Sequence, residues 1–240
     1  MEHRDRLWPG GYTFLYDDGL FRPSTDTFLL GSFPRLRRGM TVCELGAGTG
    51  LLSLLLLARE PELTVTGVEL QPQACALFRR TAEENGLQGR MHCLEGDLRQ
   101  GLLPPGRFRL AVANPPYFPP DAGAVAPDAA RRTARAETDC TLAQLCAAAA
   151  RALTWGGSFC LVHRPDRLAD VLEELRRVRL EPKRLRFVHH TAAAPPSLFL
   201  LEARLGGGVG LTVEPPLLLH GPDGGETEDV RRAYFRDKEE

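Results

Sequence analysis

Three alternate glycines, Gly46, Gly48 and Gly50, stand between a strand-like segment and a helix-like one, and no other feature constrains the fold as strongly. Thr41–Leu45 is short and apolar, and residues 51–59 are rich in leucine. Glycines allow the backbone to turn sharply and to approach a ligand without a Cβ in between. The free N–H groups at the start of the following helix suit a polar or anionic group. A dinucleotide fingerprint looks similar, so the loop alone leaves the ligand open.

The rest of the chain alternates between strand and helix patterns. We expect strands at 41–45, 64–69, 90–95, 109–113, 158–163, 185–190 and 197–205, and helices at 51–59, 72–85, 141–153 and 167–178. This alternation predicts a doubly wound, Rossmann-like α/β fold, in which helices cover both faces of a mostly parallel sheet. Ligands bind such sheets outside the C-terminal ends of the strands, at the switch point. Here that point lies between Gly46 and Asn114, which follow the first and fourth strands.

Bulk properties set the expected organisation. We expect one domain over 1–240, with a cap segment (1–39), a core (40–205) and a C-terminal extension (206–240) whose charged end, 226–240, lies on the surface. The net charge of −1 excludes a basic field over the whole chain, so any nucleic-acid surface must be local. The N-terminus shows no secretory signal and the apolar runs are too short to span a bilayer, which predicts a cytoplasmic protein without membrane contact. A monomer is expected.

The six cysteines include no CxxC pair. Three of them sit inside apolar runs, where a cysteine usually behaves as a small hydrophobic residue. We therefore expect all six to be free thiols in a reducing compartment, and we expect no metal site.

Acidic residues at the strand ends narrow the ligand. Glu44 precedes the first glycine by two positions, where a carboxylate would repel a pyrophosphate but attract a cationic sulfonium and ammonium. Glu69 ends the second strand, where it can accept both hydroxyls of a ribose, and Asp97 follows the third, where it can accept an adenine amine. These positions predict S-adenosylmethionine as the cofactor. The expected binding residues at these strand ends and loops are Glu44, Gly46, Ala47, Gly48, Gly50, Glu69, Leu70, Asp97, Leu98 and Asn114.

The tetrad Asn114-Pro115-Pro116-Tyr117 follows the fourth strand directly. Together with ELGAGTG and the acidic end of the second strand, it resembles the class I amino-methyltransferases, which act on adenine N6, cytosine N4 or a glutamine amide. The resemblance implies a seven-stranded sheet in the order 3-2-1-4-5-7-6. The oxygens of Asn114 and Pro115 can accept the two N–H bonds of a poorly nucleophilic amine and orient it. Tyr117 can stack on a planar base. No residue is expected to act as a strong base.

A closer resemblance covers most of the chain. It is carried by Asp18-Gly19, by Arg22-Pro23-Ser24-Thr25-Asp26-Thr27-Phe28-Leu29-Leu30, by residues 134–137 (ARAE), by 181–185 (EPKRL) and by 214–217 (EPPL). This pattern is similar to bacterial tRNA adenine-N6 methyltransferases that modify the adenine beside the anticodon of a valine tRNA. The resemblance implies that Thr25 and Asp26 cap the cofactor pocket and that RNA is the partner.

Two local basic clusters are candidates for phosphate contacts. Arg131, Arg132 and Arg135 follow the tetrad, and Lys183 and Arg184 lie in a basic stretch between a helix and the sixth strand. A solvated helix face is the alternative interpretation of the second cluster.

Other functions remain open at this stage. A protein glutamine N5-methyltransferase shares the tetrad, but only about 40 residues precede the first strand here, too few for its usual helical domain. A DNA or rRNA amino-methyltransferase is also possible, although no insert for sequence readout is visible. A non-catalytic scaffold and a nicotinamide oxidoreductase are disfavoured by the intact glycines and by the GxGxG spacing.

Overall fold

A computed structural model describes residues 1–20, 22–115 and 140–238. Strands and helices alternate through the middle of the chain. The strands are β1 (Glu2–Arg6), β2 (Thr13–Asp17), β3 (Thr41–Leu45), β4 (Thr64–Glu69), β5 (Met91–Glu95), β6 (Phe108–Ala113), β7 (Leu153–His163), β8 (Leu180–His189), β9 (Pro196–Leu205), β10 (Thr212–Val213) and β11 (Leu217–Leu218). The helices are α1 (Thr25–Ser32), α2 (Leu51–Arg59), α3 (Pro72–Glu84), α5 (Leu142–Ala152), α6 (Leu168–Arg177) and α7 (Glu228–Ala233), with short 3₁₀ turns η1 (Leu98–Gln100), η2 (Pro165–Arg167) and η3 (Arg236–Lys238).

The central sheet follows the doubly wound pattern. Its seven long strands run in the order β5-β4-β3-β6-β7-β9-β8, which is 3-2-1-4-5-7-6 when these strands are numbered along the chain. The strands from β5 to β7 are parallel, and β9 inserts antiparallel between β7 and β8. Among the described residues, the sheet has nine strands and not seven, because β10 and β11 add short parallel pairings to β8.

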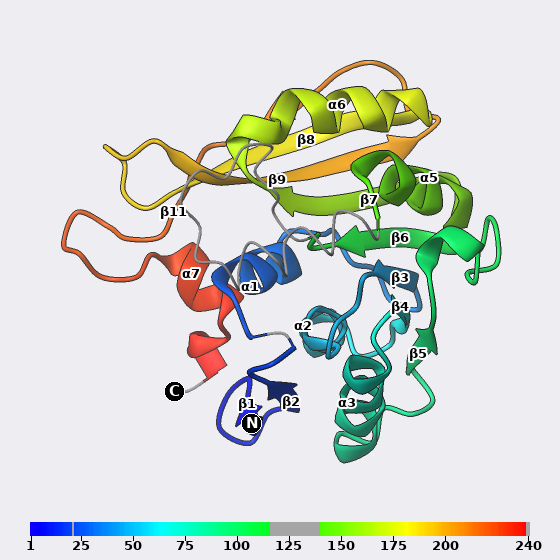
Figure 1. Cartoon of the computed structure of the whole chain (residues 1–240). Coiled ribbons are helices and arrows are strands. Elements are labelled where there is room, and N and C mark those ends of the chain that lie inside the picture. The colour runs from blue at the N-terminus through cyan, green and yellow to red at the C-terminus, as the bar shows by residue number, and fades with distance from the viewer. Residues whose placement is uncertain (21, 116–139, 239–240) are drawn as a thin grey trace.

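Two hydrophobic layers sandwich the sheet, as the alternation of side chains along each strand requires. In β3, Val42 packs into one layer while its neighbour Cys43 packs into the other. The first layer is covered by α1, α2 and α3, and the second by α5 and α6 (Figure 1). Helix α2 is buried from Leu51 through Ala58, which explains why its sequence is almost uniformly apolar.

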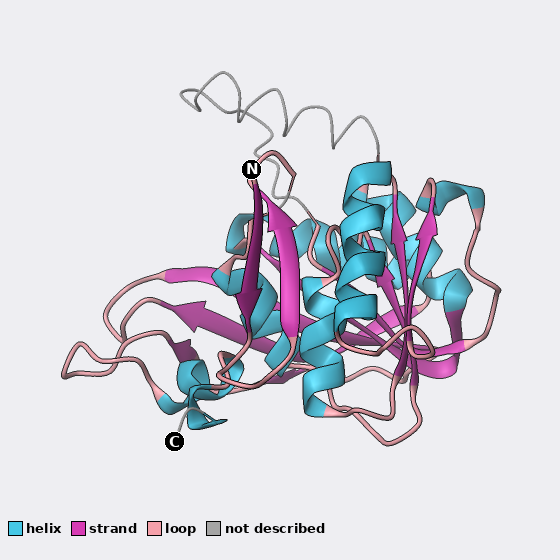
Figure 2. Ribbon diagram, turned by 90° about the horizontal axis from the view of Figure 1, so that it is seen from below, coloured by secondary structure: helices cyan, strands magenta, loops and turns pink. Residues whose placement is uncertain are grey.

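Both ends of the described chain lie on the α1 side of the sheet (Figure 1). Strands β1 and β2 form a separate antiparallel hairpin, visible at the N-terminus in Figure 2. The backbone N–H of Thr13 donates to Asn85 Oδ1 at the end of α3, at 2.8 Å. The expectation of a surface tail over 226–240 is wrong for α7 and for Phe235 two residues beyond it: Val230, Ala233 and Phe235 are buried in the α1 layer. Their apolar side chains share one face and so outweigh the charges between them.

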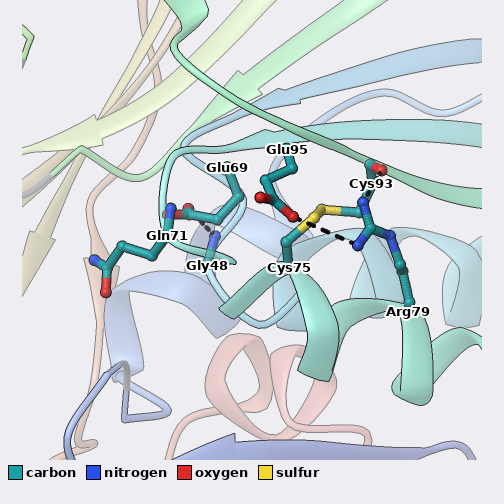
Figure 3. Close-up of a disulfide and its surroundings, with 7 residues drawn as sticks. All are labelled: Gly48, Glu69, Gln71, Cys75, Arg79, Cys93 and Glu95. Carbon is teal, nitrogen blue, oxygen red and sulfur yellow. Dashed lines mark hydrogen bonds and ion pairs between the residues drawn. A yellow bond between two sulfur atoms is a disulfide. The ribbon is translucent and has the colours of Figure 1, made fainter. Parts of the chain in front are cut away.

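The expectation of six free thiols is wrong for one pair. Cys75 on α3 and Cys93 on β5 form a disulfide, with their Cα atoms 6.0 Å apart (Figure 3). Helix α3 packs against β5, the strand that follows it in the chain. Cys75 in the first turn of the helix therefore faces Cys93 in the strand, within bonding distance. The other four cysteines are free. In the described ranges, no helix combines the length and the hydropathy that crossing a membrane requires.

Candidate active site

The glycine loop connects β3 to α2 and has the backbone that its sequence predicts. Gly46, Gly48 and Gly50 all have positive φ, at 72°, 53° and 87°, a region that residues with a Cβ rarely adopt. At Gly50, the N-cap of α2, a Cβ would also lie 2.5 Å from the Phe78 ring. The N–H groups of Gly46 and Ala47 donate to the carbonyl of Val68, each at 3.0 Å, which ties the loop to the end of β4.

Glu44 lies under this loop and is almost fully buried. Its Oε2 accepts hydrogen bonds from the backbone N–H of Ser53, at 3.0 Å, and from the Ser53 hydroxyl. Ser53 is in the first turn of α2, so this side chain satisfies a helix N–H group that has no partner within the helix. Burial raises the pKa of Glu44 to about 8, although the bonds from Ser53 favour its ionised form.

Glu69 ends β4 and holds the loop from the other side. Its Oε2 accepts the N–H of Gly48 at 2.7 Å, and its Oε1 accepts the N–H of Gln71 at 2.8 Å (Figure 3). The residue is 4% exposed, and burial raises its pKa. A carboxylate oxygen has lone pairs for more than one hydrogen bond, so Glu69 can also accept ligand hydroxyls. Leu70 beside it is exposed.

Asp97 and Leu98 follow β5, as expected. Asp97 caps η1 by accepting the N–H of Arg99 at 2.8 Å, and it also forms an ion pair with the Arg99 guanidinium at 2.5 Å. Hydrogen bonding from Arg99 lowers the pKa of Asp97, which keeps this carboxyl ionised and able to accept an amine. Leu98 lines a cavity of about 420 Å³ together with Val68; this cavity does not include Asn114.

Asn114 follows β6 at the switch point, where the neighbouring strand β3 ends in the glycine loop. It lines a narrow cavity of about 100 Å³ together with Glu44, Gly46, Ala47 and Gly48. Pro115 follows it and is partly buried. The structure thus brings the first glycines and the predicted catalytic asparagine to one place, as the topology requires. Pro116 and Tyr117 lie outside the described residues.

Helix α1 covers this cavity, but through a residue that the sequence analysis did not select. Thr27 lines the cavity, and its Oγ1 accepts a hydrogen bond of 2.9 Å from Asn114 Nδ2. Thr25, which was selected, is joined to Tyr234 by a hydroxyl–hydroxyl contact of 3.1 Å. Asp26 lines a different cavity, with Arg164. In the sequence, Thr27 stands out only as the third residue of a helix that begins after Ser24, and this position does not indicate a contact with Asn114.

Phe14 and Arg22 also line the cavity and were not selected. Phe14 comes from β2, in the hairpin that the sequence did not predict. Arg22 is exposed at the mouth and forms an ion pair with Asp18 at 3.0 Å. The first strand of this hairpin, β1, has no alternation of apolar and polar residues, so the sequence does not predict the hairpin. Only the fold shows that the hairpin forms one side of the cavity.

The basic stretch between α6 and β8 is mostly engaged within the protein. Arg184 is 12% exposed, and its Nε lies 3.0 Å from Glu202 Oε2 while its Nη1 lies 3.4 Å from Glu214. Its Nη2 donates to the carbonyl of Phe33 at 2.7 Å. The prediction that Arg184 contacts RNA therefore does not fit its burial. Lys183 donates to the carbonyl of Gly208 at 2.7 Å. Arg131, Arg132 and Arg135 lie outside the described residues.

The arrangement suits a ligand that carries hydroxyls and a positive charge. Two buried acidic side chains, Glu44 and Glu69, flank a loop whose backbone is open to close approach, and a bound cation would favour the ionised forms that their burial disfavours. The ionised Asp97 follows the next strand. Such acceptors fit the ribose, the ammonium and the sulfonium of S-adenosylmethionine. Among the described residues, no group of three His, Cys, Asp or Glu side chains is placed to hold a metal ion.

Comparison with known proteins agrees with this geometry. A family model described as "Methyltransferase small domain" matches residues 23–181. A tRNA1(Val) (adenine(37)-N6)-methyltransferase of Yersinia enterocolitica is 31% identical over 182 residues, which is 73% of this chain and 71% of that protein.

Solved structures share the fold. A protein of Agrobacterium tumefaciens described as a predicted O-methyltransferase superposes with a TM-score of 0.72 at 22% identity, over 87% of this chain and 96% of that one. Geranyl diphosphate C-methyltransferase of Streptomyces coelicolor A3(2), in complex with S-adenosyl-L-homocysteine, superposes with a TM-score of 0.55 at 14% identity, over 74% and 75%. The chain belongs to the methyltransferase small domain family and is an S-adenosylmethionine-dependent methyltransferase.

Proposed function

We propose that the enzyme methylates the exocyclic N6 amine of an adenine in RNA, in a tRNA beside the anticodon. The observation that carries the proposal is the placement of Asn114 in the cavity of the glycine loop, with its amide nitrogen bonded to Thr27. An amide oxygen and a proline carbonyl at this point match the two N–H bonds of an exocyclic amine. The name of the Yersinia relative supports adenine in tRNA as the target.

The chain's own residues would act by orientation. Asn114 Oδ1 and the carbonyl of Pro115 accept the amine hydrogens, which holds the nitrogen in line and favours its change from planar to pyramidal geometry. When bound, S-adenosylmethionine supplies an electrophilic methyl group on a good leaving group. The amine proton is lost to solvent after transfer.

Histidine is not needed as a base. His163 ends β7, next to β6, and burial lowers its pKa to about 4. Its Nδ1 accepts the backbone N–H of Arg164 at 2.8 Å. We therefore assign His163 to the structural support of this edge of the sheet.

Two exposed arginines near the site are candidates for contacts with RNA phosphates. Arg22 and Arg164 are exposed cations that line the two cavities on either side of the start of α1. Phosphates that flank an extruded base would pass this mouth, so these arginines replace Arg184 in the proposed RNA surface. An unpaired anticodon-loop base needs little energy to unstack. We also propose that the enzyme works as a monomer in the cytoplasm, where tRNA is available.

The test is methyl transfer from labelled S-adenosylmethionine into bulk tRNA from cells that lack the protein, followed by nucleoside analysis. We expect N6-methyladenosine with the wild-type enzyme and its loss with Asn114→Ala, while Glu83→Ala, on the exposed face of α3, stays active. Binding of the cofactor is measured in parallel. If tRNA stays unlabelled while a protein fraction takes up methyl groups, the RNA proposal fails and glutamine methylation replaces it.

A further inference from the structure

Thr27 connects the cap helix α1 to the predicted catalytic asparagine across 87 positions of sequence. Its Oγ1 lies 2.9 Å from Asn114 Nδ2 and 3.1 Å from Ser24 Oγ, so the threonine hydroxyl stands between the N-cap of α1 and the end of β6. A hydroxyl offers one hydrogen and two lone pairs. When it donates its one hydrogen to Ser24 Oγ, it has only lone pairs left to offer the amide, and a flipped amide oxygen would find no donor there.

The position of this hydroxyl is itself well determined. Phe28, Leu29 and Leu30, the next three residues of α1, are buried against the core. The guanidinium of Arg59 donates to the carbonyls of Gly31 and Pro34, at 2.5 and 3.0 Å, and so ties the end of α1 to α2. A rigid helix supports a precise hydrogen bond, which is what an orienting contact needs.

The chemistry of an amide makes the contact important. The two arms of an asparagine amide have the same shape but opposite hydrogen-bonding character: the oxygen accepts and the nitrogen donates. An amine that is to be methylated presents N–H bonds and so needs an acceptor. With Nδ2 directed at Thr27, Oδ1 occupies the opposite arm and faces away from α1. A flipped amide would direct N–H bonds toward the amine and would fail to hold it.

We propose that Thr27 is a positioning residue that selects the productive orientation of the Asn114 amide, and that Ser24 assists by taking the hydrogen of the Thr27 hydroxyl, which leaves Thr27 only the acceptor role. The inference rests on the proposed function of Asn114 as the acceptor of the target amine. Its role is exerted through Asn114 and not by contact with the base. It therefore affects the rate of transfer more than the binding of cofactor or RNA.

The first test compares Thr27→Val, which keeps the shape but loses the acceptor, with Thr27→Ser, which restores it. We expect kcat for tRNA methylation to fall about tenfold in Thr27→Val, the size of one lost hydrogen bond, and to recover within about twofold in Thr27→Ser. Cofactor Kd, measured by calorimetry, and KM for tRNA should stay unchanged. Ser32→Ala is the matched control, since Ser32 Oγ donates to Leu29 at the far end of the same helix.

A second test isolates orientation. In Asn114→Asp both arms are oxygens, so a flip changes nothing. If Thr27 acts by orienting the amide, Thr27→Val should lower kcat clearly less in the Asn114→Asp background than in the wild type. Thr27→Ala is the second variant in both backgrounds. An equal loss in both backgrounds, an unchanged kcat in Thr27→Val, or a loss that Thr27→Ser fails to restore would overturn the proposal. A wild-type enzyme that does not methylate tRNA would instead overturn the proposed function.

Discussion

Arg184 gives the sharpest test of what the basic stretch before β8 does. Its guanidinium is 12% exposed, and it is paired with Glu202, which is 10% exposed, and with Glu214 at the sheet edge. The guanidinium also stacks over the Phe33 ring at 4.0 Å. Replacement by methionine keeps most of the volume but removes the countercharge of Glu202, to which the neutral hydroxyl of Ser158 still donates at 2.9 Å.

The cost follows from this burial. Removing one partner of a buried ion pair usually costs about 3–5 kcal/mol, because the remaining charge is left uncompensated in a poorly hydrated place. For a chain of this size, that predicts a decrease in Tm of roughly 10 °C for Arg184→Met. The double variant Arg184→Met/Glu202→Leu removes both charges, so it should recover most of the lost stability.

The assay measures the free energy of unfolding by urea titration, together with the dependence of tRNA affinity on salt. Lys183→Met is the control and should change stability by less than about 1 kcal/mol. We expect Arg184→Met to lose stability without changing the slope of log Kd against log salt. A fully stable Arg184→Met with a slope reduced by about one would refute the structural role and return Arg184 to the RNA surface.

Two further predictions concern pH and redox state. His163 has a pKa lowered to about 4 by burial, against about 6.5 in an unfolded chain, so the folded state binds fewer protons between these values. Stability should therefore rise by about 3 kcal/mol from pH 4 to pH 6.5 relative to His163→Gln; urea titrations that give parallel pH profiles for the two proteins would contradict this. The Cys75–Cys93 disulfide closes a loop with a sequence separation of 18, so reduction should lower the free energy of unfolding by about 3 kcal/mol. Cys75→Ala should abolish the effect of reduction on stability, whereas the control Cys146→Ala should keep it. If a thiol titration counts no additional thiols after reduction, the disulfide is absent.

Much of the fold follows from local patterns, while the exceptions have identifiable causes. The glycine loop and Asn114 mark the C-terminal ends of two strands, and parallel topology then forces them together. Strand β1 has the sequence EHRDR, which shows no alternation of apolar and polar residues. Only its pairing with β2 makes it a strand, so no local pattern could predict it. In α7 the charges of the solvent face hide the apolar residues that pack inward.

The site shows the same division between local and long-range information. Strand-end residues such as Glu69 could be selected because their position in the topology implies their location. Thr27 could not, because its contact with Asn114 depends on how α1 packs, and no local pattern records that. The same holds for Arg184, because a basic stretch shows its charges but not that Glu202 and Glu214 lie opposite them.

The contact between Tyr234 and Thr25 joins positions 209 residues apart, and the Tyr234 ring stacks on Phe28 with 4.2 Å between the ring centroids. The packing of α1 is therefore completed by a residue that leaves the ribosome long after α1 does. A growing chain has the glycine loop, Glu69 and Asn114 in place while the helix above them still lacks this support. The support of α1, the helix that carries Thr27 to Asn114, is thus completed only when synthesis has passed residue 234.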